Sequence, residues 1–171
     1  MRLTRYSDYA MRVLLFLAVR PDDLCSIASI ARAHSISQNH LMKVVNDLVN
    51  AGYLSSVRGR FGGIRLARPA SEIIVGEVIR HTEDGFDLVD CDSCIIAPAC
   101  GLTGALNKAL SAFLEVLDGY SLADLVASRS AMLALFDRRD DPLAANATSG
   151  FANKAGPLTV VRPSAADRVG R

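Results

Sequence analysis

Three of the four cysteines in the chain, Cys91, Cys94 and Cys100, lie within ten residues in a C-x2-C-x5-C arrangement. Three thiolates this close could hold an iron–sulfur cluster and leave one iron for a fourth, different ligand. A C-x-x-C pair also begins many zinc sites, although no second pair and no histidine at zinc-finger spacing follows. A redox or disulfide pair would also explain the spacing, and so would three unrelated buried thiols. Pro98 and the lack of helical periodicity predict a loop, in which the sulfur atoms could converge.

Length and composition describe the chain that must position this segment. The 171 residues, half of them hydrophobic, suffice for one domain or for a small domain with an appendage. No apolar run approaches the roughly 20 residues needed to cross a membrane. Residues 13–19 mimic a short signal peptide, but Arg20 and Pro21 follow where small residues would permit cleavage. We therefore expect a cytoplasmic, reducing compartment, in which clustered cysteines favour a metal over disulfides.

The net charge of +1 hides an uneven distribution along the chain. Residues 1–70 have a balance of +6, residues 71–136 a balance of −7, and residues 137–171 a balance of +2. A basic front part on an acidic body indicates a polyanion-binding face on one part of the molecule, with ordinary charge scatter as the alternative.

The basic front part has the pattern of a helix-turn-helix. The spacing of its apolar residues predicts a first helix that begins near Ser7, with Ser7 or Asp8 as its N-cap. Two further helices, at residues 27–33 and 38–50, are joined by a tight turn. This arrangement is typical of proteins that place their second short helix in the major groove of DNA.

A basic hairpin is predicted directly after these helices. Residues 53–57 and 64–67 are strand candidates, and the segment Arg-Gly-Arg-Phe-Gly-Gly at residues 58–63 separates them. A helix-turn-helix followed by such a hairpin is a winged helix-turn-helix, in which the wing reaches an adjacent groove or phosphates. Residues 1–70 are therefore predicted to bind operator double-stranded DNA.

Polar side chains on the helix at residues 38–50 and on the wing are the candidates for DNA contact. Glutamine and asparagine can pair bidentately with adenine edges, and lysine suits guanine or phosphate. The arginines fit phosphates or a narrow minor groove. The expected DNA-binding residues are Ser37, Gln38, Asn39, His40, Lys43, Arg58, Arg60 and Arg65. For the helix residues alone, a solvated polar helix end is the alternative.

A long amphipathic helix is predicted over residues 101–118, where leucine and phenylalanine recur at helical spacing. A small winged domain offers little surface to cover this apolar face. We therefore expect a homodimer whose paired DNA-binding domains match a two-fold operator, with packing inside one chain as the alternative. Shorter helices are predicted at residues 75–81 and 122–136.

The predicted fold class is mostly α with a small β-wing, a winged helix-turn-helix followed by a long dimerisation helix. Residues 1–70 form the DNA-binding domain, and residues 71–136 contain the cluster-binding loop and the dimerisation helices. From residue 137 onward alanine, proline, glycine, serine and asparagine dominate and apolar periodicity stops. Residues 137–171 are therefore predicted to be a disordered tail.

Taken together, these motifs resemble the dimeric winged-helix iron–sulfur regulators, a family that includes NsrR, IscR and RirA. The resemblance covers about residues 1–136. It depends on residues 1–4 and 7–10, on the wing at residues 57–66, and on three cysteines before a long helix. Residues 88–106 and 120–126 are most similar to the nitric-oxide-sensing, NsrR-like members.

The resemblance implies a transcriptional repressor that senses nitric oxide through a cluster, 4Fe–4S rather than 2Fe–2S. It implies that Cys91, Cys94 and Cys100 hold this cluster and that Asp8 of the partner subunit completes the ligand set. The interval between Cys91 and Cys94 is tighter than the family usually shows. Cys25 matches no ligand position, and we expect it to be a small buried hydrophobic residue.

The same residues are compatible with different functions and roles. An iron-responsive or cluster-supply regulator of the RirA or IscR type shares the same fold. Without the resemblance, Asp8 would be interpreted as a helix cap or as a partner of Arg12 one turn later. A zinc-stabilised DNA-binding module without sensing is a further alternative. We expect no enzymatic activity, because the basic wing and the lack of nucleotide signatures such as G-x-G-x-x-G argue against a redox enzyme.

Overall fold

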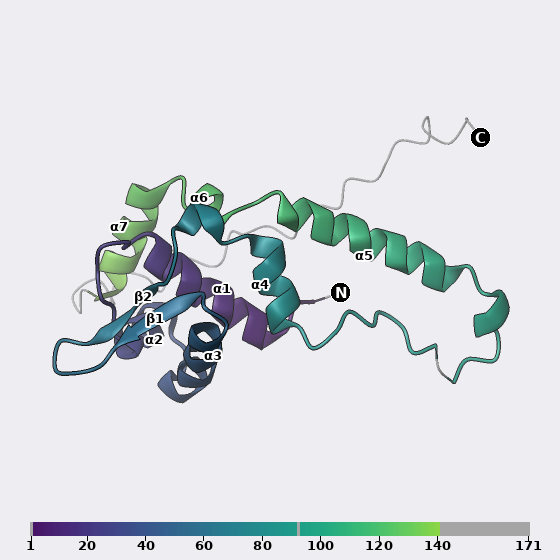
Figure 1. The fold of residues 1–171 in the computed structure, drawn as a ribbon, viewed down its shortest axis with the longest axis horizontal. Helices are drawn as coiled ribbons and strands as arrows, with labels where there is room; N and C mark the ends of the chain where they lie inside the picture. The colour runs from purple at the N-terminus through teal and green to yellow at the C-terminus, as the bar shows by residue number, and fades with distance from the viewer. Residues whose placement is uncertain (1, 92, 141–171) are drawn as a thin grey trace. The chain divides into compact units, whose positions relative to one another are not determined.

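The computed structural model describes residues 2–91 and 93–140. It is mostly helical with one small two-stranded sheet, as the sequence predicted (Figure 1). The elements are α1 (Arg5–Ala18), α2 (Ile27–His34), α3 (Gln38–Asn50), β1 (Leu54–Val57), β2 (Gly63–Leu66), α4 (Val75–Thr82), α5 (Leu102–Asp118), α6 (Leu122–Leu125) and α7 (Arg129–Asp140), with short 3₁₀ turns at Ala70–Glu72 and Ala97–Ala99. No helix in the described ranges is long and apolar enough to cross a bilayer.

Helix α1 lies at the centre of the hydrophobic core. Its apolar face, which includes Val13, Leu14 and Leu17, is almost completely shielded from solvent. The helix begins two residues earlier than predicted, because Thr4 is its N-cap and accepts a hydrogen bond from the backbone N–H of Ser7 at 3.2 Å. The prediction that Ser7 or Asp8 caps the helix is therefore wrong. Ser7 is instead a fully buried residue of the first turn.

Helices α2 and α3 form the predicted helix-turn-helix. Ser26 caps α2 by accepting from the backbone N–H of Ser29 at 3.0 Å. The turn depends on Ser35, whose φ of 54° reverses the chain in the left-handed region. The apolar face of α3, which includes Leu41 and Leu48, joins the core around α1. Its opposite face is left exposed to solvent.

The wing, which we define as residues 54–66, is the antiparallel hairpin of β1 and β2. The strands pair from Leu54 opposite Leu66 to Val57 opposite Gly63. The backbone of Cys25 forms an isolated antiparallel bridge with β2, in which Cys25 and Ile64 exchange hydrogen bonds of 3.0 and 2.9 Å. A Cβ atom at Gly63 would lie 2.9 Å from the carbonyl oxygen of Cys25, so this close approach requires glycine. The base of the wing is thereby fixed to the core.

The chain segment just before α4 pairs with the segment just after α5. Ile74 and Ser121 form an isolated antiparallel bridge, and the backbone N–H of Leu122 donates to the carbonyl of Ile73 at 2.9 Å. No residue of α5 itself is buried. The end of α5 is therefore held beside α4, and within the described chain its apolar face is covered only in part.

The predicted single helix over residues 122–136 is wrong. Helix α6 ends at Leu125, a turn occupies residues 126–128, and α7 begins at Arg129. Helix α7 then packs on the DNA-binding domain, where the rings of Phe136 and Phe16 lie 4.9 Å apart. It continues to Asp140, beyond the predicted start of the tail at residue 137. The remainder of that predicted tail, residues 141–171, lies outside the described residues.

Candidate nucleic-acid interface and cysteine loop

The N-terminal end of α3 presents polar side chains to solvent. Ser37, Gln38, Asn39, His40 and Lys43 are all exposed. Ser37 occupies the N-cap position, but its side chain makes no capping hydrogen bond. The first backbone N–H groups of α3 therefore remain available, and such groups favour an anion such as a DNA phosphate.

The wing presents its arginines next to this helix end. Arg58, Arg60 and Arg65 are exposed, and Arg65 Nε donates to Ser55 Oγ across the hairpin at 3.4 Å. Gly59 has a φ of 119°, a backbone conformation that side chains other than glycine rarely adopt. The turn therefore requires the conformational freedom of glycine at position 59, and it places Arg58 and Arg60 at the tip of the wing.

A groove of about 390 Å³ separates α3 from the wing. Its lining includes Gln38 and Met42 of α3 and Val57, Gly62 and Gly63 of the wing. In winged-helix proteins a helix in the major groove and a wing in the adjacent groove lie on either side of the DNA backbone. The groove thus lies between the two elements that carry the predicted DNA-contacting residues, and Gln38 is the one of these residues that lines it.

The three clustered cysteines lie in the cysteine loop, residues 83–101, between α4 and α5. Successive turns join them: the N–H of Cys94 donates to the carbonyl of Cys91 at 3.2 Å, and that of Ala97 to Cys94 at 3.1 Å. The N–H of Cys100 then donates to Ala97 at 3.3 Å. Cys94 is exposed, whereas Cys91 and Cys100 are partly exposed, and all three are free thiols.

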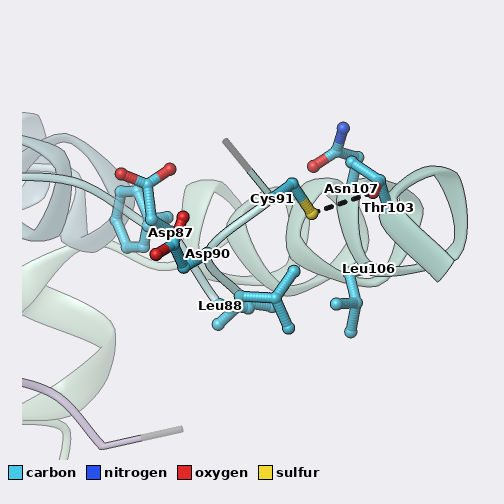
Figure 2. Close-up of a pocket in the computed structure, with 9 residues that line it drawn as sticks. Asp87, Leu88, Asp90, Cys91, Thr103, Leu106 and Asn107 are labelled. Carbon is cyan, nitrogen blue, oxygen red and sulfur yellow. Dashed lines mark hydrogen bonds between the residues drawn. The ribbon is translucent and has the colours of Figure 1, made fainter. Parts of the chain in front are cut away.

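Cys91 lies beside the start of α5, and both line a hollow of about 510 Å³ (Figure 2). Its Sγ atom lies 3.3 Å from Thr103 Oγ1, which is the hydrogen bond drawn in the figure. Leu88 and Leu106 also line the hollow. The side chain of Cys91 is thus placed against α5. Thr103 is a neighbour that the sequence pattern did not identify, although it follows Cys100 by only three positions.

The predicted cluster ligands are not assembled in this single chain. Within the described ranges, no group of three or more histidine, cysteine, aspartate or glutamate side chains is arranged to hold a metal ion. Asp8 pairs with Arg12, whose Nε lies 2.9 Å from Asp8 Oδ1, and both side chains are almost half exposed. This is the helix-surface ion pair that the sequence offered as the alternative role of Asp8.

Cys25 is separate from this loop and is buried, as predicted. Its backbone pairs with Ile64, and its side chain belongs to the core around α1. Burial raises the pKa of the Cys25 thiol, with a further increase from nearby Asp23 and a decrease from Arg20. A raised pKa disfavours the thiolate, which agrees with the packing role that burial in the core gives Cys25.

A polar network that the sequence pattern did not reveal joins the start of the cysteine loop to α1. Glu83 Oε1 accepts hydrogen bonds from the backbone N–H of Thr4 at 2.9 Å and from its hydroxyl at 3.1 Å. The same oxygen accepts from the hydroxyl of Ser7, which in turn accepts from Thr82 Oγ1 at 2.8 Å. Glu83 therefore holds the N-terminus of α1, next to Asp8.

A second unpredicted contact joins α4 to α3. His81 Nε2 lies 2.9 Å from Asp47 Oδ2, and the ring of His81 lies 5.8 Å from that of Tyr53. Tyr6 of α1 also bonds to Asp47. Burial is the largest cause that raises the pKa of Tyr6 to about 12, and the hydrogen bond to Asp47 is the second. Residues 81–83, where α4 meets the cysteine loop, thus contact both α1 and α3. Because these partners lie far apart in sequence, no local pattern could have predicted them.

The helix-turn-helix, the basic wing and the exposed polar end of α3 define a winged-helix DNA-binding regulator. A family model described as Rrf2, iron-dependent transcriptional regulator, matches residues 3–128. The chain belongs to the Rrf2 family. It is a transcriptional regulator and not an enzyme, as the sequence predicted.

Curated relatives agree with this assignment. The chain is 53% identical over 132 residues to the HTH-type transcriptional regulator NsrR of Bacillus licheniformis, a match that covers 74% of this chain and 92% of the relative. It is 48% identical over 146 residues to NsrR of Bacillus subtilis, covering 82% of this chain and all of the relative. Each match therefore extends well beyond the length of the DNA-binding domain.

Solved structures share the fold at lower identity. IscR of T. potens is 27% identical with a TM-score of 0.63, covering 75% of this chain and 88% of that chain. CymR, the global cysteine regulator of B. subtilis, is also 27% identical, with a TM-score of 0.62, and the match covers 75% of this chain and 98% of that chain. The winged-helix fold class predicted from the sequence is therefore confirmed.

Proposed function

We propose that this protein is an iron–sulfur-cluster-containing, DNA-binding transcriptional repressor that senses nitric oxide. One observation carries the proposal: three free thiols occupy a loop of a Rrf2 chain that is about half identical to two NsrR regulators. That loop begins at Glu83, which contacts α1, and ends at Gly101, before α5. A chemical change at the thiols therefore takes place in the segment that joins the DNA-binding domain to α5.

The donor set fits an iron–sulfur cluster. Cys91, Cys94 and Cys100 are at least partly exposed, they lie in successive turns outside the long helices, and none is in a disulfide. These three residues would hold the cluster as thiolates, and Asp8 of the partner subunit would supply the fourth ligand. When bound, the cluster supplies iron to which nitric oxide can bind. The similarity to NsrR regulators favours a 4Fe–4S form over 2Fe–2S.

We further propose that the repressor is a homodimer formed through α5. The apolar face of this helix is partly or fully open to solvent: Leu102 is 53% and Val116 is 61% exposed. A second copy of the same helix would cover this surface with two-fold symmetry. The two DNA-binding domains would then address two operator half-sites about one helical turn apart or a multiple of it.

The contacts of residues 81–83 supply the route from the loop to DNA. Glu83 holds the start of α1, and His81 bonds Asp47 of α3, the helix that presents Gln38 and Asn39. If Asp8 is bound to the partner's cluster, its release frees α1 at the end that Glu83 holds. Sensing is then a coupling free energy between the two sites, typically about 1–3 kcal/mol, which corresponds to about 5- to 150-fold in affinity.

The test is an anaerobic titration at fixed salt, using a duplex selected by the wild-type protein from a random-sequence library. We expect tight binding by the cluster-loaded protein and weak binding by the nitric-oxide-treated and cluster-free forms. Iron, sulfide and visible absorbance measured on the same samples report whether a cluster is present. Equal affinities in all three states would contradict the sensing function, and a colourless zinc protein would contradict the cluster.

An iron- or cluster-supply regulator of the RirA or IscR type is the second candidate. It is favoured by the iron-dependent description of the family and by the structural likeness to IscR of T. potens. The higher identity to the two NsrR regulators favours nitric oxide as the signal. DNA release on iron depletion, without release by nitric oxide, would decide for the second candidate.

A further inference from the structure

The most exposed large hydrophobic side chain of the wing is an aromatic ring. Phe61 is 88% exposed at the tip of the hairpin. Its neighbour Arg60 directs its guanidinium over the ring, with the Cζ atom 5.8 Å from the ring centroid. The exposed arginines Arg58 and Arg65 belong to the same wing. A large apolar group is therefore surrounded by positive charge, and the proposed function assigns it no role.

The backbone holds this ring outward. The N–H of Gly62 donates to the carbonyl of Gly59 at 3.0 Å and closes the turn around Phe61. A Cβ atom at Gly62 would collide with the carbonyl oxygen of Val57, so the chain can turn this tightly only with glycine there. The base of the wing is paired with Cys25. Phe61 thus lies in a turn whose backbone is fixed by these contacts.

The surroundings of the ring indicate what it contacts. An apolar protein partner would have to desolvate the neighbouring guanidinium groups, which is costly without matching acids. DNA satisfies both features, since phosphates pair with arginine and the minor groove accepts an apolar side chain. Proteins that read the minor groove commonly combine arginine with a wedge such as phenylalanine, which partly unstacks a base step and bends the duplex.

We propose that Phe61 is a DNA-contacting residue that enters the minor groove beside the half-site read by α3 and packs against a base step there. The wing can reach that groove because it flanks the surface next to α3. The contact would favour sequences with a flexible pyrimidine–purine step at this position, because such steps unstack at low cost. This inference rests on the DNA-binding function.

The experiment compares the anaerobically purified full chain with Phe61→Ala, Phe61→Leu and Leu135→Ala. Leu135 is a matched control, since it is 63% exposed on α7, away from the wing. The probe is the duplex selected by the wild-type protein from a random-sequence library, labelled at both ends so that energy transfer reports its bend. Affinity is measured at several salt concentrations.

We expect Phe61→Ala to bind about ten-fold more weakly and to bend the duplex less, with an unchanged salt slope because no charge is removed. Phe61→Leu should retain most of the affinity and bend, and Leu135→Ala should match wild type. Unchanged affinity or bend in Phe61→Ala overturns the inference, and so does a reduced salt slope, which would mean that the ring only positions Arg60. Wild-type protein that selects no duplex would instead contradict the DNA-binding function.

Discussion

Arg80 of α4 forms a bidentate ion pair with Asp118, the last residue of α5. Each of two guanidinium nitrogens lies 2.6 Å from one carboxylate oxygen. Gly76 makes room for this pair, because a Cβ atom there would collide with the Asp118 carboxylate. The pair joins the C-terminal end of α5 to α4. It fixes the end of α5 opposite the cysteine loop.

We therefore predict that Asp118→Asn loosens α5 at neutral pH. The hydrogen bond from Arg80 lowers the pKa of Asp118 in the folded protein. A depressed folded pKa stabilises the fold above the unfolded value of about 3.9, and this contribution is lost as pH falls through the folded pKa. The melting temperatures of cluster-free wild type and Asp118→Asn should thus differ at pH 7, the difference should begin to shrink at about pH 4, and it should vanish only below the folded pKa of Asp118. A pH-independent difference would show that the pair does not stabilise the fold.

Packing of α7 on the DNA-binding domain leads to a second prediction. The ring of Phe136 lies 4.9 Å from Phe16 and 5.3 Å from His34, and the Arg20 guanidinium stacks over Phe16 at 4.1 Å. Phe136→Ala should lower the free energy of unfolding by about 1–3 kcal/mol, less than a fully buried phenylalanine because the side chain is partly exposed. Urea unfolding measures this, with the exposed Leu135 changed to alanine as control. Equal losses in both variants would contradict the packing role.

The same contacts define where the chain can be shortened. Truncation after Asp140 should leave dimerisation and specific DNA binding nearly intact, since the sequence beyond it has little apolar periodicity. Truncation after Ser128 should instead destabilise the protein, because it removes α7 and with it Phe136. Gel filtration and operator titration of both shortened chains distinguish these outcomes.

Local patterns explain why the DNA-binding domain was predictable. Ser26 capping, the apolar spacing of α3 and the glycines of the wing are each decided by a few neighbouring residues. The start of α1 could not be predicted in this way, because Thr4 and Ser7 are both candidate N-caps. A carboxylate 79 residues away, that of Glu83, hydrogen-bonds to Thr4 and favours it as the cap. The apolar periodicity also continues through residues 122–136 and therefore predicted one helix. In the structure, the capping box of Ser121 and Asp124 belongs to a separate short helix that ends at Leu125.

In the candidate site, too, some features could be predicted from local sequence patterns and others could not. The exposure of Gln38, Asn39 and the wing arginines follows from helix and hairpin periodicity, and the structure shows it. Whether the cysteines converge could not be decided from their spacing, because spacing in a loop does not fix how the backbone folds. The structure instead places Cys91 against Thr103 and pairs Asp8 with Arg12.

The exposed α3 and wing residues should make different kinds of DNA contact. Arg58→Ala or Arg60→Ala should weaken binding to all duplexes and reduce the salt slope by roughly 0.9 for each phosphate that the variant no longer neutralises. Gln38→Ala or Asn39→Ala should leave the slope unchanged and relax preference at one base pair, by about 1–3 kcal/mol if the wild-type side chain binds its base bidentately. Salt titrations against the selected duplex and its single-base variants measure both effects. Unchanged slopes for both arginine variants would mean that the wing does not touch phosphate.

The last prediction concerns the cluster ligands, and the chain contains a matched control for it. Cys94→Ala should prevent stable cluster assembly because it removes one of three thiolates, whereas Cys25→Ala should assemble normally because Cys25 is a core residue. Iron and sulfide content with visible absorbance, measured anaerobically, separate the two. Equal cluster content in both variants would exclude Cys94 as a ligand.

Asp8→Ala tests the fourth ligand under the same conditions. It should give a cluster that forms but dissociates faster, because three thiolates remain while the oxygen ligand is absent. Arg12→Ala is the necessary companion: it breaks the observed 2.9 Å ion pair without removing the carboxylate, so it should leave the cluster as stable as in wild type or more stable. If Asp8→Ala and Arg12→Ala destabilised the cluster equally, the ion pair and not ligation would account for the effect. If Asp8→Ala matched wild type in lifetime and spectrum, Asp8 would not be a ligand.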